Sequence, residues 1–223
     1  MKRLLTIFTI MLVATVTNAD NITGVYKTIT MDGSSADWTG VDVMYPDGQI
    51  TDGLPLTSTY SEVYVCNNGG SLYAGLATKG TGGANIMNVF TRNLYIDTDM
   101  NPATGFNAGW MSGGYDRLVQ YGAEGTAYSI YEFTGASQAE WSWGFLGLIS
   151  YSFSDNFIEW DIPRAQLGGS TQARLEFNVT GGVSTETWAY EWESSVGTYT
   201  FGVPEPAFLG LGIIGIMALI RRK

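Results

Sequence analysis

Three oxygen-bearing side chains, Asp97, Asp99 and Asn101, occupy alternate positions in the stretch "YIDTDMNPATG". Alternation along a strand places Asp97 and Asp99 on one face. Hard oxygen ligands at this spacing suit calcium, which takes about six to eight oxygens. Asp116, on a neighbouring predicted strand, is a candidate further ligand. An Asx-rich turn that needs no metal explains the same residues, and the sequence leaves both interpretations open.

Aromatic rings are the second chemical resource, with seven tryptophans and thirteen tyrosines in 223 residues. Sugars present C–H faces that stack on such rings, while amides and carboxylates bind their hydroxyl groups. Two candidate groups each share one face of a predicted strand: Trp141 with Trp143, and Trp188 with Tyr190 and Trp192. The alternative is that these rings only fill a hydrophobic core.

The composition argues against several kinds of enzyme. The chain has no histidine, which removes Ser-His-Asp and Cys-His catalysis and the usual zinc sites. A glycosidase using Glu159 and Asp161, on one face of a predicted strand, remains as an alternative. Because acidic residues are common in this chain and nothing else marks a catalytic cleft, we expect a protein that is not an enzyme.

The elements that would position these residues are short strands. Alternating runs bounded by Gly, Asn, Asp and Ser predict strands at 60–68, 71–79, 88–99, 115–123, 126–134, 157–163, 173–182 and 186–194. Only "PRAQLGG" (163–169) predicts a helical turn. The pattern indicates an all-β protein with one antiparallel β-sandwich of the jelly-roll or immunoglobulin-like kind. Its single cysteine, Cys66, allows no intrachain disulfide.

Four stretches resemble family-nine carbohydrate-binding modules and the related DOMON-like sandwiches: "ITMDGSSADWTGV", "LYIDTDMNPATGF", "GGYDRLVQY" and "IEWDIPRAQLG". They occur in the family's order and together cover most of residues 29 to 168. The resemblance implies a β-sandwich that binds carbohydrate. Within it we expect Asp37 to cap a short helical turn, Trp38 to plug the edge of the sandwich, and Glu159 either to pair with a positive group or to complete a polar network. Haem binding, known among DOMON relatives, lacks its histidine ligand here.

The N-terminus predicts export. Lys2 and Arg3 precede an apolar run that ends in small residues before Asp20, which is the layout of a signal peptide over residues 1–19. Signal peptidase is therefore an expected partner.

The C-terminus predicts a sorting tail over residues 203–223. Its motif Pro204-Glu205-Pro206 is followed by fourteen apolar residues and then by Arg221, Arg222 and Lys223. At 1.5 Å per residue this run covers only ~21 Å of a hydrocarbon core ~30 Å thick. The arrangement closely resembles the PEP-CTERM signal of Gram-negative bacteria. The resemblance implies transient insertion of a short hydrophobic helix in the membrane and removal of the tail by an exosortase-type protease.

Without both ends, the domain at 20–202 keeps six basic and twenty acidic residues, a net charge near −14. Such a surface repels nucleic acid and anionic lipid and favours cations. The sequence therefore predicts a protein of the cell surface or extracellular matrix that binds polysaccharide without catalysis and holds structural calcium. A matrix protein with no specific ligand is the alternative.

Overall fold

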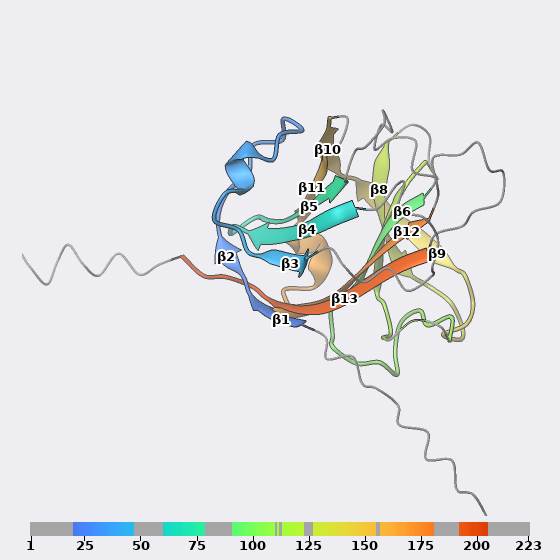
Figure 1. Ribbon diagram of the computed structural model, residues 1–223. Helices are drawn as coiled ribbons and strands as arrows, with labels where there is room; N and C mark the ends of the chain where they lie inside the picture. The colour runs from blue at the N-terminus through green and yellow to red at the C-terminus, as the bar shows by residue number, and fades with distance from the viewer. Residues whose placement is uncertain are drawn as a thin grey trace, which may run out of the picture.

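The computed structural model describes residues 20–46, 60–78, 91–109, 111, 113–122, 127–154, 157–180 and 192–204. These residues form two β-sheets packed face to face as a sandwich, together with two short 3-10 helices (Figure 1). The fold is therefore all-β, as predicted.

Seven strands form the first sheet, called sheet A, in the order β1-β13-β12-β6-β7-β8-β9. Their bounds are β1 Asp20–Thr23, β13 Trp192–Thr200, β12 Gln172–Thr180, β6 Thr91–Asp97, β7 Arg117–Tyr121, β8 Tyr128–Phe133 and β9 Trp143–Leu148. Neighbouring strands are antiparallel, except that β1 runs parallel to β13. Strand β9 is one edge of this sheet.

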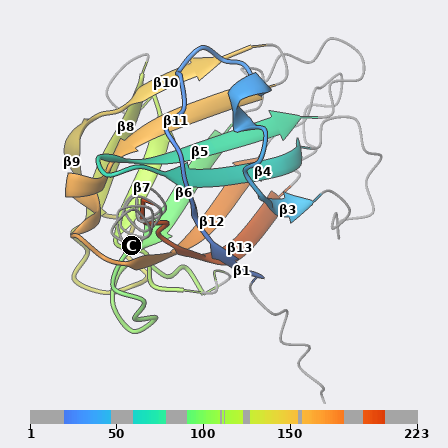
Figure 2. The same ribbon diagram turned by 90° about the vertical axis from the view of Figure 1, so that its left-hand side faces the viewer.

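Six strands form sheet B, in the order β10-β11-β5-β4-β2, with β3 also paired to β4. Their bounds are β10 Ser150–Phe153, β11 Phe157–Pro163, β5 Ser71–Thr78, β4 Tyr60–Asn67, β2 Val25–Tyr26 and β3 Val43–Pro46. Strand β2 is parallel to β4, and the other pairs are antiparallel. Figure 2 shows β10, β11, β5 and β4 lying in front of sheet A.

Strict alternation of side chains explains why the two sheets pack. In β6, Leu94 and Ile96 face the core between the sheets, while Tyr95 and Asp97 lie on the outer face. The inter-sheet core is the largest hydrophobic cluster and draws on both sheets. Smaller clusters lie on the outer faces, under segment 29–41 on sheet B and under residues 106–115 on sheet A.

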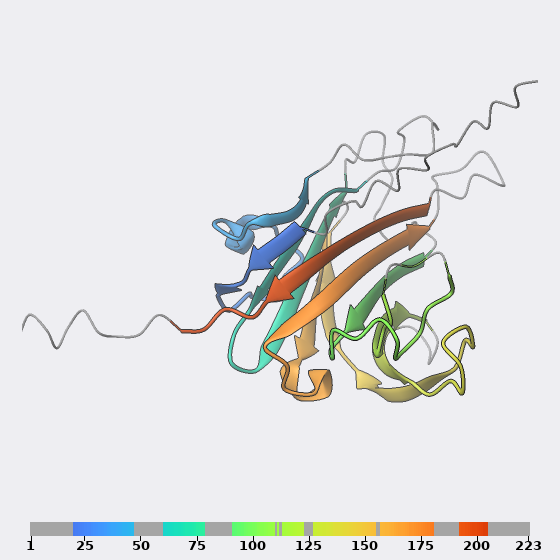
Figure 3. The same cartoon turned by 90° about the horizontal axis from the view of Figure 1, so that it is seen from below.

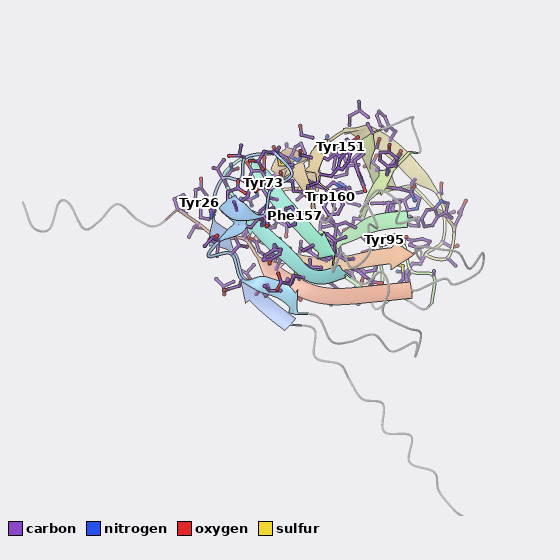
Figure 4. All side chains as sticks on the ribbon, turned by 45° about the horizontal axis from the view of Figure 1, so that its top comes forward. Tyr26, Tyr73, Tyr95, Tyr151, Phe157 and Trp160 are labelled. Carbon is purple, nitrogen blue, oxygen red and sulfur yellow. The ribbon has the colours of Figure 1, made fainter. Side chains whose placement is uncertain are left out.

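Trp38 is buried as expected, but it covers the outer face of sheet B and not the edge of the sandwich. The 3-10 helix η1 (Ala36–Trp38) carries its ring to a site where 2% of the residue stays exposed. Its Nε1 donates to Glu159 Oε2 at 2.9 Å, and Oε1 accepts the N–H groups of Asp32 at 2.7 Å and Gly33 at 2.6 Å. Figure 4 shows Phe157, which packs edge-on against Trp38, on this side of the molecule.

The predicted cap at Asp37 is wrong. Asp37 lies inside η1, and the N-cap residue is Ser35, whose side chain makes no capping bond. Instead, Asp37 Oδ2 accepts the N–H of Thr30 at 2.6 Å, which fastens the segment before the helix.

Most predicted strands match the structure. Six of the eight runs contain β4, β5, β6, β7, β8 and β11, the run at 173–182 covers β12 except for Gln172, and the run at 186–194 overlaps β13 only from Trp192 onward. The predicted helical turn is η3 (Arg164–Leu167), which ends at Gly168 with φ 70°. The sequence placed Trp141 and Trp143 on a strand without giving the bounds of β9, and it missed β10 and the short strands β1 to β3.

The two predicted end segments lie largely outside the described residues, namely residues 1–19 and 205–223. Across the part of the chain that the structure describes, no helix has the length and apolar character needed to cross a bilayer. The described chain leaves the sandwich at Pro204, beside β2 (Figure 1).

Candidate functional site

The first candidate site is a cluster of three carboxylates at one end of sheet A. Asp97 ends β6, Asp99 lies in the turn that follows, and Asp116 immediately precedes β7. One oxygen atom from each carboxylate lies within 4.8 Å of the others. The N–H of Asp116 donates to the carbonyl of Ile96 at 3.0 Å, which holds the two strand ends together.

Asp97 is the buried member of this cluster. None of its surface is exposed, and within the described residues neither carboxylate oxygen accepts a hydrogen bond of ordinary geometry, although the backbone N–H of Met100 stabilises its charged form. Arg174 Nη1 lies 3.8 Å from Oδ2 and offsets part of the charge. Burial raises the pKa of Asp97 to about 6 against this attraction, and Asp116 and Asp99 raise it further.

The other polar groups build the turn around Asp97. Asp116 Oδ2 accepts the N–H and hydroxyl of Thr98, each at 2.8 Å. Asp99 Oδ1 accepts the N–H of Asn101 at 2.8 Å, and its Oδ2 accepts the hydroxyl of Thr104 at 2.9 Å. Met100 between them has φ 58°, a left-handed conformation that is uncommon for a residue with a side chain.

Asn101 acts in the turn. Its Oδ1 accepts the N–H of Ala103 at 3.1 Å, an Asx-turn bond. The Asx-turn interpretation describes these bonds, and the same region also brings three carboxylates together.

The chemistry of the cluster fits a hard cation. Two oxygens on opposite sides of one calcium ion, each ~2.4 Å away, lie ~4.8 Å apart, which matches the spread of the three carboxylates. Without a cation, three acidic groups share a small volume, and the buried one, Asp97, is offset only in part by Arg174 at 3.8 Å. Asp97, Asp99 and Asp116 are the side chains that would hold the ion.

The second candidate site is an aromatic stripe at the open edge of sheet A. Trp143 and Phe145 lie on the outer face of β9, Trp141 directly precedes the strand, and Leu148 ends it. Trp141, Phe145 and Leu148 are 54%, 50% and 62% exposed. We call these four residues the aromatic stripe.

Trp141 and Trp143 have different roles within the stripe. Their ring planes are inclined by 71°, with centroids 5.7 Å apart, so they form no common flat platform. Trp143 is partly buried against Tyr95, Phe106 and Phe133, whereas the Trp141 ring is exposed. Trp141 is therefore available for stacking and Trp143 supports it from below.

One row of paired residues leads from the interior of sheet A to this stripe. It crosses five strands as Glu176, Tyr95, Leu118, Tyr131 and Phe145. Figure 4 shows Tyr95 at the end of the sandwich opposite Tyr26. Glu176 is buried and accepts a hydrogen bond from the hydroxyl of Tyr115.

Polar atoms without a partner gather on this outer face. Besides the two oxygens of Asp97, four atoms on this face are buried and make no hydrogen bond within the described residues: Asn93 Oδ1, Ser129 Oγ, Tyr131 Oη and Trp143 Nε1. Ser129 is paired with Leu148 and Tyr131 with Phe145, so these side chains share the face of the stripe. Buried polar groups normally find a partner in protein, water or ligand.

The remaining predicted aromatic residues are not placed. Trp188 and Tyr190 lie outside the described residues, as does the side chain of Trp192, whose backbone begins β13. Sequence reasoning missed Phe145 and Leu148. Trp143 and Phe145 alternate visibly in "WGFLGL", but the irregular register opposite Ile130 and Tyr131 breaks the pattern before Leu148.

Glu159 serves the structure. It is buried, and its two oxygens accept the three hydrogen bonds from Trp38, Asp32 and Gly33 described above. Burial raises its pKa against these three donors. A carboxylate occupied in this way has no free oxygen facing a substrate, so the geometry gives no support to catalysis by Glu159 with Asp161.

Comparison with known proteins finds a solved structure of similar fold. No protein-family model matches the sequence, and no curated protein matches it. The structure is similar to a carbohydrate-binding module of family nine from Caldicellulosiruptor kristjanssonii, solved in complex with cellotriose. The TM-score is 0.51 at 12% identity, over 85% of this chain and 97% of the other. The chain thus has a fold like that of family-nine modules.

Proposed function

We propose that this chain is an exported β-sandwich protein that binds a polysaccharide, without catalysis, across the outer face of sheet A. The observation that carries the proposal is the aromatic stripe beside unpartnered polar atoms on the same face. A fold like that of a module solved with cellotriose supports it.

The aromatic rings and the polar atoms would bind different parts of a sugar. The exposed rings of Trp141 and Phe145 stack against the C–H faces of sugar rings, and Leu148 extends this apolar surface. Asn93 Oδ1 and the hydroxyls of Ser129 and Tyr131 lie buried beneath this surface, and a sugar hydroxyl reaches them only when the side chains that cover them move aside. A ligand that offers both C–H faces and many hydroxyls fits this surface better than a purely apolar one does.

Charge favours a neutral ligand. The protein carries a formal net charge of −10, so an anionic polymer is repelled over the whole surface. The stripe itself contains no ionisable side chain. A neutral polysaccharide is not repelled by this negative charge.

A calcium ion at Asp97, Asp99 and Asp116 is the second part of the proposal. It would neutralise the cluster and supply partners to the two unbonded oxygens of Asp97. Its role there is to hold the ends of β6 and β7 together, away from the sugar.

Export and sorting complete the proposal. The signal peptide over residues 1–19 and the PEP-CTERM-like tail from Pro204 place the domain at the surface or in the matrix of a Gram-negative bacterium. Signal peptidase and an exosortase-type protease are its processing partners, and the tail is inserted in the membrane until it is removed. The described chain ends at the opposite end of the sandwich from Tyr95, so a tethered domain would hold its binding face away from the attachment point.

The binding proposal is tested with purified protein on an array of neutral and acidic glycans in calcium. We expect saturable binding to a neutral glycan. Replacement of Trp141 or Phe145 by Ala should weaken that binding about tenfold or more, since a stacked ring contributes on the order of 1–2 kcal/mol.

Phe153→Ala is the matched control, because Phe153 is an exposed aromatic residue on β10 of the other sheet. It should bind like the wild type. An array without binding to any glycan would reject the proposal and favour a matrix protein without a specific ligand. Equal losses for Phe153→Ala and Trp141→Ala would show that the site is elsewhere.

A further inference from the structure

The loop that carries the carboxylates is fastened to the loop that carries Trp141. Gln138 Nε2 donates to the carbonyls of Pro102 at 3.0 Å and Thr104 at 2.9 Å. The Gln138 carbonyl accepts the N–H of Asn107 at 2.8 Å. Figure 3 shows these segments, green after β6 and yellow before β9, lying side by side.

Trp141 follows Gln138 by three residues and rests on the same carboxylate-bearing loop. Its ring meets Phe106 edge-on, with centroids 5.1 Å apart and planes inclined by 85°. Phe106 in turn exchanges two backbone hydrogen bonds with Tyr115, at 2.8 and 2.9 Å. The support of the exposed ring therefore depends on where residues 102–106 lie.

The carboxylates accept hydrogen bonds from residues at both ends of that loop. Asp99 holds Thr104 directly, and Asp116 holds Thr98 from the far end, next to Tyr115. Asp97 is buried, neither of its oxygens accepts a hydrogen bond of ordinary geometry within the described residues, and one of them lies within 4.8 Å of an oxygen of each of the other two carboxylates, while Arg174 Nη1 lies 3.8 Å from Oδ2. A cation here would join the two loop ends, whereas mutual repulsion of three carboxylates would push them apart.

Backbone packing makes the loop rigid enough to transmit such a change. A Cβ on Gly114 would lie 1.7 Å from the carbonyl oxygen of Thr104, so only glycine lets these two segments touch. Thr104 is also one of the two residues whose carbonyls bind Gln138. A shift at the loop ends must therefore move the acceptors of Gln138.

We propose that cation occupancy of the Asp97, Asp99 and Asp116 cluster positions Trp141 through Gln138, and so sets the affinity of the aromatic stripe for sugar. The inference rests on the proposed function for its sugar-binding part. Gln138 is a positioning residue that touches neither the cation nor the sugar. Couplings of this kind change affinity by roughly 5- to 150-fold, and we expect about tenfold here.

The test follows the indole N–H signal of Trp141 in ¹H–¹⁵N spectra of the purified protein, assigned with Trp141→Phe. Calcium binding is measured by calorimetry and glycan affinity by titration, each in calcium and in chelator. In the wild type, calcium should shift the Trp141 signal and raise glycan affinity about tenfold.

Two variants isolate the link. Gln138→Ala and Gln138→Met, the second of similar size but without donors, should bind calcium within about threefold of the wild type. Their Trp141 signal should not respond to calcium, and their glycan affinity should be equally low with and without it. Gln172→Ala, which removes an exposed amide bonded to Thr200 on β13, should behave like the wild type.

The outcomes separate the two proposals. Absence of calcium binding, a Trp141 signal indifferent to bound calcium, or a full response in both Gln138 variants would overturn the inference. So would a wild-type glycan affinity that chelation leaves unchanged. If the signal responds through Gln138 but no glycan binds in either state, the positional coupling holds and the carbohydrate-binding function is what fails.

Discussion

Asn67 binds both backbone polar groups of Gly202, the last buried residue of the described chain. Its Oδ1 accepts the N–H of Gly202 at 2.7 Å, and its Nδ2 donates to the Gly202 carbonyl at 2.9 Å. Oδ1 also accepts the hydroxyl of Tyr199 at 2.7 Å. One side chain on β4 thereby fixes the chain just beyond β13, two residues before Pro204.

Replacing Asn67 by Ala should destabilise the protein strongly. The change leaves three buried polar groups without partners, and we expect a loss of about 3 kcal/mol in the free energy of unfolding. In thermal unfolding this corresponds to a decrease in melting temperature of roughly 6–12 °C. The control Gln172→Ala, which removes an exposed amide, should change the melting temperature little. An Asn67→Ala protein as stable as the wild type would show that the strand end is held by packing alone.

Glu159 and Trp38 should be energetically coupled. Glu159→Gln replaces one accepting oxygen by an NH2 group, which then faces another donor, either the indole N–H of Trp38 or the N–H groups of Asp32 and Gly33, and should cost about 2–3 kcal/mol. Trp38→Phe removes the indole donor, so Glu159→Gln should cost less in that background. A double-mutant cycle by denaturant unfolding should give a coupling of at least 0.5 kcal/mol. Strict additivity would contradict the hydrogen-bond assignment.

Chelation should lower the melting temperature of the wild type if the cluster holds calcium. At a ligand concentration a hundred times the dissociation constant, binding contributes about 2.7 kcal/mol, or roughly 5–10 °C for a domain of this size. The double change Asp97→Asn and Asp99→Asn should abolish this sensitivity. Equal melting curves of the wild type with calcium and with chelator would show that the loop is only a turn and holds no calcium.

In chelator, the wild type should respond to pH through Asp97, which faces Asp99, Asp116 and Arg174. Its folded-state pKa of about 6 lies above the ordinary value of 3.8, so its contribution to stability is full below 3.8 and is lost as the pH rises through 6. Between pH 7.5 and 5, protonation of this one group adds roughly 1–1.5 kcal/mol. Urea unfolding at the two pH values should therefore show that the free energy of unfolding of the wild type, relative to that of Asp97→Asn, increases by this amount from pH 7.5 to pH 5. No difference between the two pH profiles would mean that Asp97 titrates normally.

The sorting tail predicts a definite mass. Protein recovered from the surface of its host should lack residues 1–19 and most of the chain after Pro204, before any added modification. Intact-mass spectrometry measures this directly. Surface-exposed protein that still carries Arg221, Arg222 and Lys223 would indicate a plain anchor.

Local pattern was sufficient for much of the fold. Alternation of apolar and polar residues predicted β4, β5, β6, β7, β8, β11 and β12, because burial of one sheet face leaves a period of two in the sequence. It failed for β9, where two glycines and an irregular register hide the alternation, and for β1 to β3, which are too short to show a period. The sequence also carried no sign that β1 runs parallel to β13 and β2 parallel to β4, because pairing direction depends on partners far along the chain.

The candidate site divides in the same way. The sequence alone determined that Asp97, Asp99 and Asn101 form an acidic turn and that Trp141 and Trp143 are candidate rings, because these residues are close neighbours in the chain. Only the tertiary structure decided that Asp97 is buried against Arg174, that Trp143 supports while Trp141 is exposed, and that Gln138 joins the two loops. Those relationships link residues tens of positions apart. They follow from how the strands of sheet A pair, which no local window of sequence contains.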